Sequence, residues 1–399
     1  MIYKLKKHCK QLPLDFLGAI WLRIALMPFF AHEDIISTYR RSLEIVLGQQ
    51  GWFSFTSVVP HSIQATYLWF ISFFTGIEYL ESITVHVASI NQINSLLFLF
   101  KFPYLIAEIV FWYLMISSFK FDNFTRKIML FNPIVIYSVY MFGRYESFVL
   151  LLAVCLLIAI KKNKFIRQAF VFLALLLTRV SMILVIPSFL LLSIKISDKL
   201  KFIGVFVVGL LLSIILIPQD SIIGLINWVI SGQHTSYLFE SRLIISDNFY
   251  IPILPVAMVF LFGLGFYFIN KYQPKLDNAT RFSLGAFVIL ASYYSLALFH
   301  PQYVVWSLPF FFLLLNQFMS SRLKLLAVLS HVVFFLILPF WEGKTTLGLL
   351  FPVFESLWFV DLSQPLFLSV AKVGKLLFSI TMMLTVSELF IQLKRSSNE

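Results

Sequence analysis

Two adjacent carboxylates stand in the most polar segment near the start of this chain. The segment HEDIISTYRRS (32–42) directly follows the apolar run 16–31. A carboxylate at the edge of hydrocarbon can take a proton from an attacking hydroxyl, and an arginine can hold a phosphate through two parallel hydrogen bonds. Glu33 or Asp34 could therefore serve as a general base, with Arg40 as a substrate contact. Alternatively, these charges only end a membrane helix.

Three later breaks between apolar runs carry similar residues. They read FGRYES (142–147), TRVS (178–181) and HPQYVVW (300–306). Arginines close to hydrocarbon suit an anionic headgroup, and amides or aromatic rings suit a sugar. The candidate residues in these breaks are Arg144, Glu146, Arg179, His300, Gln302 and Tyr303.

Lys101 and Glu108 are ionisable residues inside another apolar run. Seven residues separate them, which places both on one helix face about 10 Å apart. Ionisable residues within a membrane span usually face a polar cavity or each other. Two interpretations remain: the residues contact a substrate, with Lys101 on an anion, or they form an ion pair that locks two spans.

Composition indicates what holds these segments in place. The chain has 399 residues, of which 60% are hydrophobic and 13% charged, against roughly 25% charged in an average soluble domain. Lipid must therefore be the solvent for much of the chain. We predict an all-α polytopic membrane protein that forms a single transmembrane domain over residues 1–399.

About 20 apolar residues cross a bilayer, and on that basis the sequence predicts about twelve spans. Several are shorter than this length and must tilt or be shielded by neighbours. The stretch 62–76 is apolar but is interpreted as an interfacial or re-entrant element. The expected spans are 14–31, 94–119, 128–142, 147–160, 165–178, 181–195, 201–217, 250–270, 282–299, 303–319, 323–340 and 367–392.

The distribution of charge predicts the orientation. With a cytoplasmic N-terminus, most of the 31 basic residues fall in short cytoplasmic loops, as the positive-inside rule requires. The long loops 32–93, 218–249 and 341–366 are then extracytoplasmic and hold most of the acidic residues. This arrangement explains the net charge of +12 without nucleic acid. The expected location is a bacterial plasma membrane, or the endoplasmic reticulum membrane of a eukaryote.

Few residues suit a metal or a disulfide. Cys9 and Cys155 are the two cysteines; one precedes the first span and the other lies inside a later span. No pair of acidic residues has a clear metal-binding spacing. We expect no cofactor and no metal site, although a divalent cation remains an alternative.

The order of these motifs resembles the GT-C superfamily of integral-membrane glycosyltransferases, in particular its polyprenol-phosphate-mannose-type and related bacterial branches. The resemblance runs from an acid in the first outer loop through a lysine and an acid in the second span. It continues through Asn132–Pro133 and the turn 143–146 to the late motif 300–309, with His-Pro-Gln-Tyr, Trp306 and Pro309. No single motif is specific, and the order and topology carry the likeness over about residues 14–320.

The resemblance implies a hexosyltransferase that moves mannose or glucose from a polyprenyl-phosphate donor to an extracytoplasmic glycan or lipid acceptor, with inversion. By resemblance the general base is Asp34, with Glu33 as the competing neighbour. Many family members have Gly-Gln-x-Asp where this chain has Arg144 and Glu146, so the role of Glu146 is left open. The implied donor-phosphate contacts are Arg144, Arg179, Lys101 and His300, and the implied sugar or acceptor contacts are Tyr39, Arg40, Glu108, Glu146, Gln302 and Tyr303.

Two other functions fit parts of the pattern. A transporter or flippase for lipid-linked sugars would use Lys101 and Glu108 as a site in the middle of the membrane. However, the paired interrupted halves common in transporters are not found. A ligase for glycans on polyprenyl diphosphate would need more basic residues on the outer face.

Overall fold

The protein is represented by a computed structural model in which the placement of most of the chain is described. The expected loops 218–249 and 341–366 lie almost entirely outside the described residues, as does the side chain of Glu33. The described residues are 14–54, 57–85, 90–219, 223, 242–246, 249–273, 276–296, 300–338 and 365–395.

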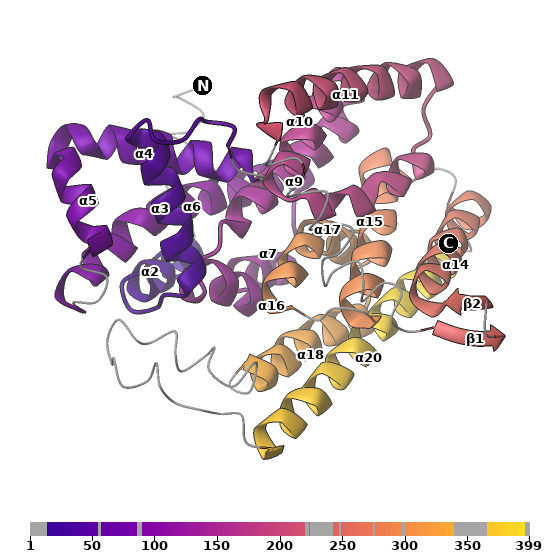
Figure 1. The fold of residues 1–399 in the computed structure, drawn as a ribbon. Coiled ribbons are helices and arrows are strands. Elements are labelled where there is room, and N and C mark those ends of the chain that lie inside the picture. Colours follow the sequence, from indigo (N-terminus) through magenta and orange to yellow (C-terminus); the bar gives the residue numbers. More distant parts are fainter. Residues whose placement is uncertain are drawn as a thin grey trace.

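The described chain is mostly helical (Figure 1). The helices in the N-terminal half are α2 (Leu14–Leu26), α3 (Glu33–Val46), α4 (Val58–Thr75), α5 (Ile77–Val85), α6 (Ile90–Phe119), α7 (Asn123–Leu130), α8 (Pro133–Val135), η1 (Ile136–Met141), α9 (Glu146–Lys161), α10 (Phe165–Thr178), η2 (Val180–Leu191) and α11 (Ile196–Leu216). The later elements are β1 (Arg242–Ser246), β2 (Phe249–Pro252), α14 (Ile253–Tyr272), α15 (Asn278–Leu296), α16 (Pro301–Val304), η3 (Val305–Ser307), α17 (Leu308–Phe318), α18 (Ser321–Ile337) and α20 (Pro365–Arg395).

Helices α3, α4 and α5 form a small layer against the first half of α6. Its core contains Ile35, Tyr39 and Leu43, which recur on one face of α3 at helical spacing. They pack on Leu68 of α4 and Phe100 of α6. This layer is separate from the main hydrophobic core and positions the start of α3.

Helix α15 lies at the centre of the main core. All its side chains from Ala279 to Tyr294 are buried, because it packs against η2, α9, α14, α17 and α20. A helix that is apolar on every side belongs inside a large core. Helices α18 and α20 run side by side beneath it (Figure 1).

Apolar residues cover the outside of other helices. Large side chains such as Leu212 and Ile215 of α11 and Val259 of α14 are more than half exposed. Within the described residues, four helical segments are long and apolar enough to cross a membrane: Leu96–Phe119, Ile196–Leu216, Ile253–Tyr272 and Lys372–Arg395. The fold is thus that of a mostly helical protein with candidate membrane spans.

The described residues of the expected spans are mostly helical, with local differences, but among the described residues the four segments above are the ones long and apolar enough to cross a membrane. Residues 297–299 and 339–340 of the expected spans lie outside the described part. The span 128–142 is broken at Asn132–Pro133 and continues as the π-helix η1, because proline suits the first turn of a new helix. The stretch 62–76 forms most of helix α4.

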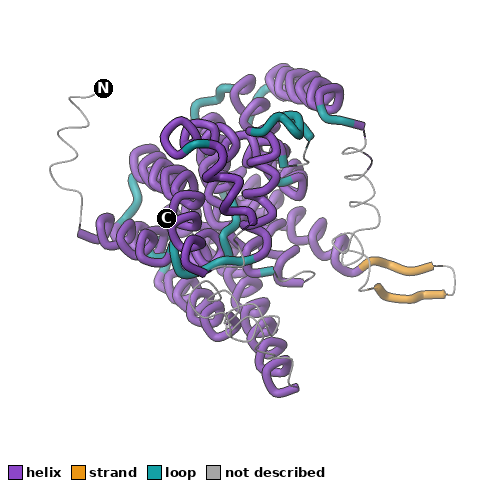
Figure 2. The backbone as a smooth tube through the Cα atoms, turned by 60° about the vertical axis from the view of Figure 1, so that its left-hand side comes forward, coloured by secondary structure: helices purple, strands orange, loops and turns teal. Residues whose placement is uncertain are grey.

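The prediction of an entirely α-helical chain needs one correction. Strands β1 and β2 form an antiparallel hairpin that projects from the helical body (Figure 2). β2 occupies positions expected to begin the span 250–270, so α14 starts at Ile253. Alternating and β-branched residues such as those of RLIIS favour a strand.

Candidate functional site

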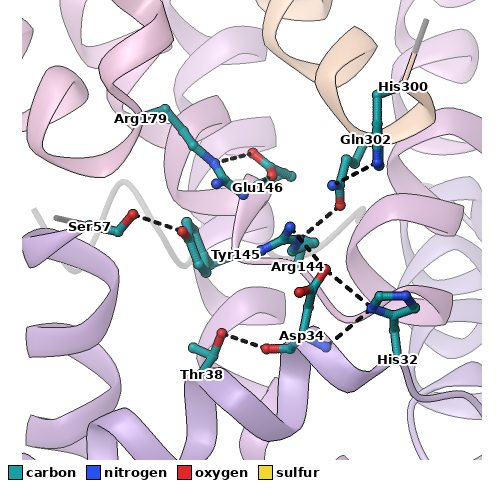
Figure 3. A network of polar contacts seen from close by, with 10 residues as sticks. All are labelled: His32, Asp34, Thr38, Ser57, Arg144, Tyr145, Glu146, Arg179, His300 and Gln302. Atoms are coloured by element: carbon teal, nitrogen blue, oxygen red, sulfur yellow. Dashed lines mark hydrogen bonds and ion pairs between the residues drawn. The ribbon is translucent and has the colours of Figure 1, made fainter. Parts of the chain in front are cut away.

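An ion pair between Asp34 and Arg144 forms the centre of a polar cluster (Figure 3). The Arg144 Nη2 lies 2.9 Å from Asp34 Oδ2, and His32 Nδ1 lies 3.2 Å from the same oxygen. The side chains of Asp34, Arg144 and His32 are 30%, 19% and 26% exposed. The pair is therefore half-enclosed by protein and still reachable by a ligand.

The start of α3 fixes the position of Asp34. His32 is the N-cap, and its Nδ1 accepts a hydrogen bond from the Asp34 backbone N–H at 3.1 Å. The His32 ring also stacks on Phe142, with centroids 3.8 Å apart. A carboxylate in the first helical turn is favoured by the partial positive charge of the helix N-terminus. The local sequence thus places Asp34 at a capped helix end.

Two short helices, α8 and η1, and the turn that follows them position Arg144. Asn132 caps α8, its Oδ1 accepting from the N–H groups of Ile134 and Val135. The π-helix η1 follows, and the Arg144 N–H closes the turn on Ser138 O at 3.0 Å. π-Helical turns occur frequently at functional sites. They change the direction in which the next residues leave the helix.

Gly143 lets this turn approach α3. Its φ is +84°, and an added Cβ would lie 2.9 Å from the Cβ and Cδ1 of Ile35. Only glycine adopts this backbone region without strain and leaves room for Ile35. The close approach brings Arg144 to Asp34, the residue before Ile35.

We expect Gly143→Ala to lower the free energy of unfolding by about 1–2 kcal/mol for the left-handed backbone alone, and by more from the contact with Ile35. Thermal unfolding of the purified protein measures the loss. Gly204→Ala in α11 is the matched control, since nothing lies within 4 Å of its added Cβ. That change should be neutral or stabilising; equal losses in both variants would contradict this account of Gly143.

The late motif 300–306 contributes the other side of the cluster. Arg144 Nε donates to Gln302 Oε1 at 2.9 Å, and Gln302 Nε2 lies 3.4 Å from His300 Nε2. Tyr303 stacks on the His300 ring with centroids 4.5 Å apart. Gln302 thus orients the guanidinium of Arg144, while His300 and Tyr303 continue the cluster outward.

A second, buried ion pair lies beside the first. Arg179 pairs with Glu146, whose side chain is fully buried, and Trp306 Nε1 donates to Glu146 Oε2 at 2.6 Å. The Arg179 guanidinium also lies 4.3 Å from the centre of the Tyr145 ring. Tyr145 in turn donates to Ser57 Oγ at 2.9 Å. Glu146 therefore holds Arg179 next to Tyr145 and Trp306, beside the pair of Asp34 and Arg144.

The electrostatics of the cluster keep Asp34 ionised. Burial alone would raise the pKa of its carboxyl, but the close polar contact with His32 and the charge of Arg144 together lower the pKa to about 2. The carboxylate form is thus present at any physiological pH. It is also a weak base as long as Arg144 stays in place.

Lys101 and Glu108 lie elsewhere, and they do not pair with each other. Lys101 is fully buried and donates to three backbone carbonyls. Glu108 accepts from Arg23 at 2.8 and 3.0 Å and from the Tyr140 hydroxyl at 2.5 Å. Within the described part of the chain, no contact between side chains joins either residue to the cluster around Asp34. The expected ion pair between Lys101 and Glu108 is therefore wrong, and Glu108 instead forms a buried ion pair with Arg23 of α2.

Tyr39 and Arg40 are likewise outside the cluster. Tyr39 is buried, and its hydroxyl donates to Leu80 O at 2.8 Å, which ties α3 to α5. Arg40 is exposed on α3, and no contact within the described residues connects it with Arg144 or Asp34. Glu33 begins α3, and its side chain lies outside the described part.

Sequence reasoning missed Arg23, Tyr140 and His61. Arg23 and Tyr140 lie within apolar runs, and only the buried carboxylate of Glu108 signalled that a partner was needed. His61 is buried in α4 beside Tyr145, with ring centroids 6.1 Å apart. Burial, with the charges of Arg41, Arg179 and Arg144, lowers the pKa of His61 to about 3. It therefore adds a neutral polar group beside the arginines.

Within the described residues, no group of three or more histidine, cysteine, aspartate or glutamate side chains lies close enough to hold a metal ion. No protein-family model, curated protein or solved structure matches this chain. The geometry of the cluster therefore carries the functional argument.

Proposed function

We propose that this protein is a GT-C-like membrane glycosyltransferase. It transfers a hexose, mannose or glucose, from a polyprenyl-phosphate donor to a glycan or lipid acceptor. Asp34 is the general base of an inverting reaction. The chain crosses the membrane about twelve times, with the N-terminus in the cytoplasm and the cluster on the extracytoplasmic face of a bacterial plasma membrane, or the lumenal face of the endoplasmic reticulum.

The observation that carries this proposal is the contact of Asp34 with Arg144 at a half-enclosed position. One residue supplies a base and the other a phosphate ligand, which are the two groups such a transfer needs. They come from distant segments and are held by separate devices, the cap at His32 and the turn at Gly143. Helix α4, which packs against α3, exposes Trp69, Phe70 and Phe73, and such an apolar surface suits a donor with a long hydrocarbon chain.

In the proposed step, an acceptor hydroxyl attacks the anomeric carbon of the donor sugar. Asp34 takes the hydroxyl proton as the new C–O bond forms. The bond from the anomeric carbon to the phosphate oxygen breaks on the opposite face, and the lipid phosphate leaves with the electron pair. Arg144 stabilises the charge that develops on the phosphate.

Arg144 would also control the basicity of Asp34. Without a donor, His32 and the Arg144 guanidinium together hold the pKa of Asp34 low, so the carboxylate is a poor base. A donor phosphate that binds Arg144 weakens this pairing. The pKa of Asp34 then rises towards a value at which it can accept a proton.

The transporter alternative has lost its main support. It relied on Lys101 and Glu108 as a polar site in the membrane. However, the Lys101 ammonium donates to three backbone carbonyls, and the Glu108 carboxylate pairs with Arg23. Asp34, Arg144 and His32, by contrast, are 30%, 19% and 26% exposed.

The pH dependence of kcat/KM tests the role of Arg144. Because kcat/KM reports the free enzyme, it should not fall with the titration of Asp34 until the pH approaches the pKa of about 2. Arg144→Gln removes the opposite charge, so the acid limb should move up by about one unit or more. An acid limb at the same pH in both proteins would contradict the pairing.

The direct test offers labelled short-chain polyprenyl-phosphate mannose and glucose to the detergent-purified protein. We expect one donor to be consumed, with label released to water or transferred to a co-purifying acceptor and free polyprenyl phosphate as the second product. If neither donor is consumed but vesicles containing the protein move the labelled lipid between leaflets, the transporter interpretation replaces this one.

A further inference from the structure

Lys101 is a fully buried lysine that the proposed reaction does not use. Its ammonium group donates to Met27 O at 2.9 Å, Phe30 O at 2.5 Å and Tyr140 O at 2.7 Å. An ammonium has three N–H donors, and all three are occupied by backbone carbonyls. A neutral amine would have only two, so the contacts fit the charged form. No donor remains for a phosphate.

The three carbonyls belong to two segments of the chain. Met27 directly follows α2, Phe30 lies in the turn beyond it, and Tyr140 lies in the last turn of η1. Carbonyls in the last turn of a helix lack partners within the helix. The Lys101 ammonium provides a hydrogen-bond donor to each of the three carbonyls.

Each of these two positions leads directly to one member of the ion pair. Phe30 precedes His32 and Asp34 by a few residues, and Tyr140 precedes Gly143 and Arg144 by a similar number. The Lys101 ammonium therefore contacts the chain just before both segments. Tyr140 is held a second time, because its hydroxyl donates to Glu108.

We propose that Lys101 is a positioning residue that joins the C-termini of α2 and η1 and thereby sets the geometry of Asp34 against Arg144. The effect of Lys101 on catalysis rests on the proposed function, whereas its effect on the approach of the two segments does not. Without the ammonium, the carbonyls of Met27 and Phe30 would face that of Tyr140 with no donor between them. The two segments would then separate, and the ion pair would lengthen.

The structural test measures how closely the two segments approach. His32 and Phe142 lie on opposite segments with ring centroids 3.8 Å apart. The variant His32→Cys/Phe142→Cys, with Cys9 and Cys155 replaced by serine, is treated with a short bifunctional methanethiosulfonate. The fraction of linked chain is followed over time with lysine, glutamine or methionine at position 101.

We expect linking to slow at least tenfold for Lys101→Met and by an intermediate factor for Lys101→Gln, which keeps two donors but no charge. Gln168→Met is the matched control, because Gln168 is also buried and also donates to a backbone carbonyl, that of Ala159. It should leave the rate unchanged. Equal linking rates at all three side chains would overturn the proposal.

Loss of the folded state in both Lys101 variants, seen by thermal unfolding, would also overturn it, since Lys101 would then serve global stability alone. In otherwise native protein, the activity of Lys101→Met distinguishes positioning from phosphate binding. A lower kcat with the donor KM within about threefold supports positioning. A donor KM raised more than tenfold at unchanged kcat contradicts it. If the native protein consumes no donor, the proposed function fails while the linking rates still decide the role of Lys101.

Discussion

Asp34→Asn should lower the rate of sugar transfer by about 10²–10⁴-fold, the usual contribution of a positioned general base. The asparagine side chain cannot accept the proton of the attacking hydroxyl. Its carbonyl oxygen can still accept a hydrogen bond from Arg144, so the variant should fold and insert normally. Initial rates with the labelled donor, at matched amounts of folded protein, measure the effect.

Glu33→Gln is the matched control for this change, because Glu33 is the neighbouring carboxylate and also lies in the first turn of α3. It should keep transfer within about threefold of the native rate if Asp34 is the base. The reverse result, with Asp34→Asn active and Glu33→Gln inactive, would assign the base to Glu33. Full activity in both variants would end the proposal for this segment.

Glu108→Ala should cause the largest loss of stability, about 3–5 kcal/mol. The carboxylate pairs with Arg23, both side chains are buried, and Tyr140 adds a hydrogen bond. Removing the carboxylate leaves the Arg23 guanidinium as an unpaired buried charge, although Trp112 lies 4.6 Å from it and provides partial compensation. Thermal and denaturant unfolding of the purified protein measure the loss.

The double variant Arg23→Met/Glu108→Leu separates the ion pair from the site it occupies. Apolar residues of similar volume often replace a buried ion pair without loss, so this variant should recover most of the stability. A double variant as unstable as Glu108→Ala would show that packing around α2 and α6, and not the unpaired charge, explains the single change.

These changes act on two connected groups of residues. The first group, Arg23, Glu108 and Lys101, joins α2, α6 and η1. The second group, Asp34 and Arg144, lies on the segments that follow α2 and η1. A change in the first group should therefore alter the geometry of the second, whereas Asp34→Asn should leave the first group intact.

The cluster was partly predictable from residue types. Ionisable residues are costly beside hydrocarbon, so the polar breaks at 32–42, 142–147, 178–181 and 300–306 stood out. The structure brings residues of all four breaks into one network (Figure 3). The same rule identified Lys101 and Glu108 as unusual, but the energetic cost of a buried charge does not show which group compensates it. The partner of Glu108 is Arg23, and the partners of Lys101 are three backbone carbonyls. A sequence motif does not show which backbone groups a side chain will contact.

The sequence alone determined the helical character of this chain, the positions of its apolar segments and the residue types of its polar breaks. These follow from local composition and from the transfer of side chains out of water. Only the tertiary structure decided that Asp34 faces Arg144, that Glu146 holds Arg179 and that Lys101 serves backbone carbonyls. Such pairings depend on where the chain turns, at Gly143 and through η1, and on contacts between residues far apart in sequence.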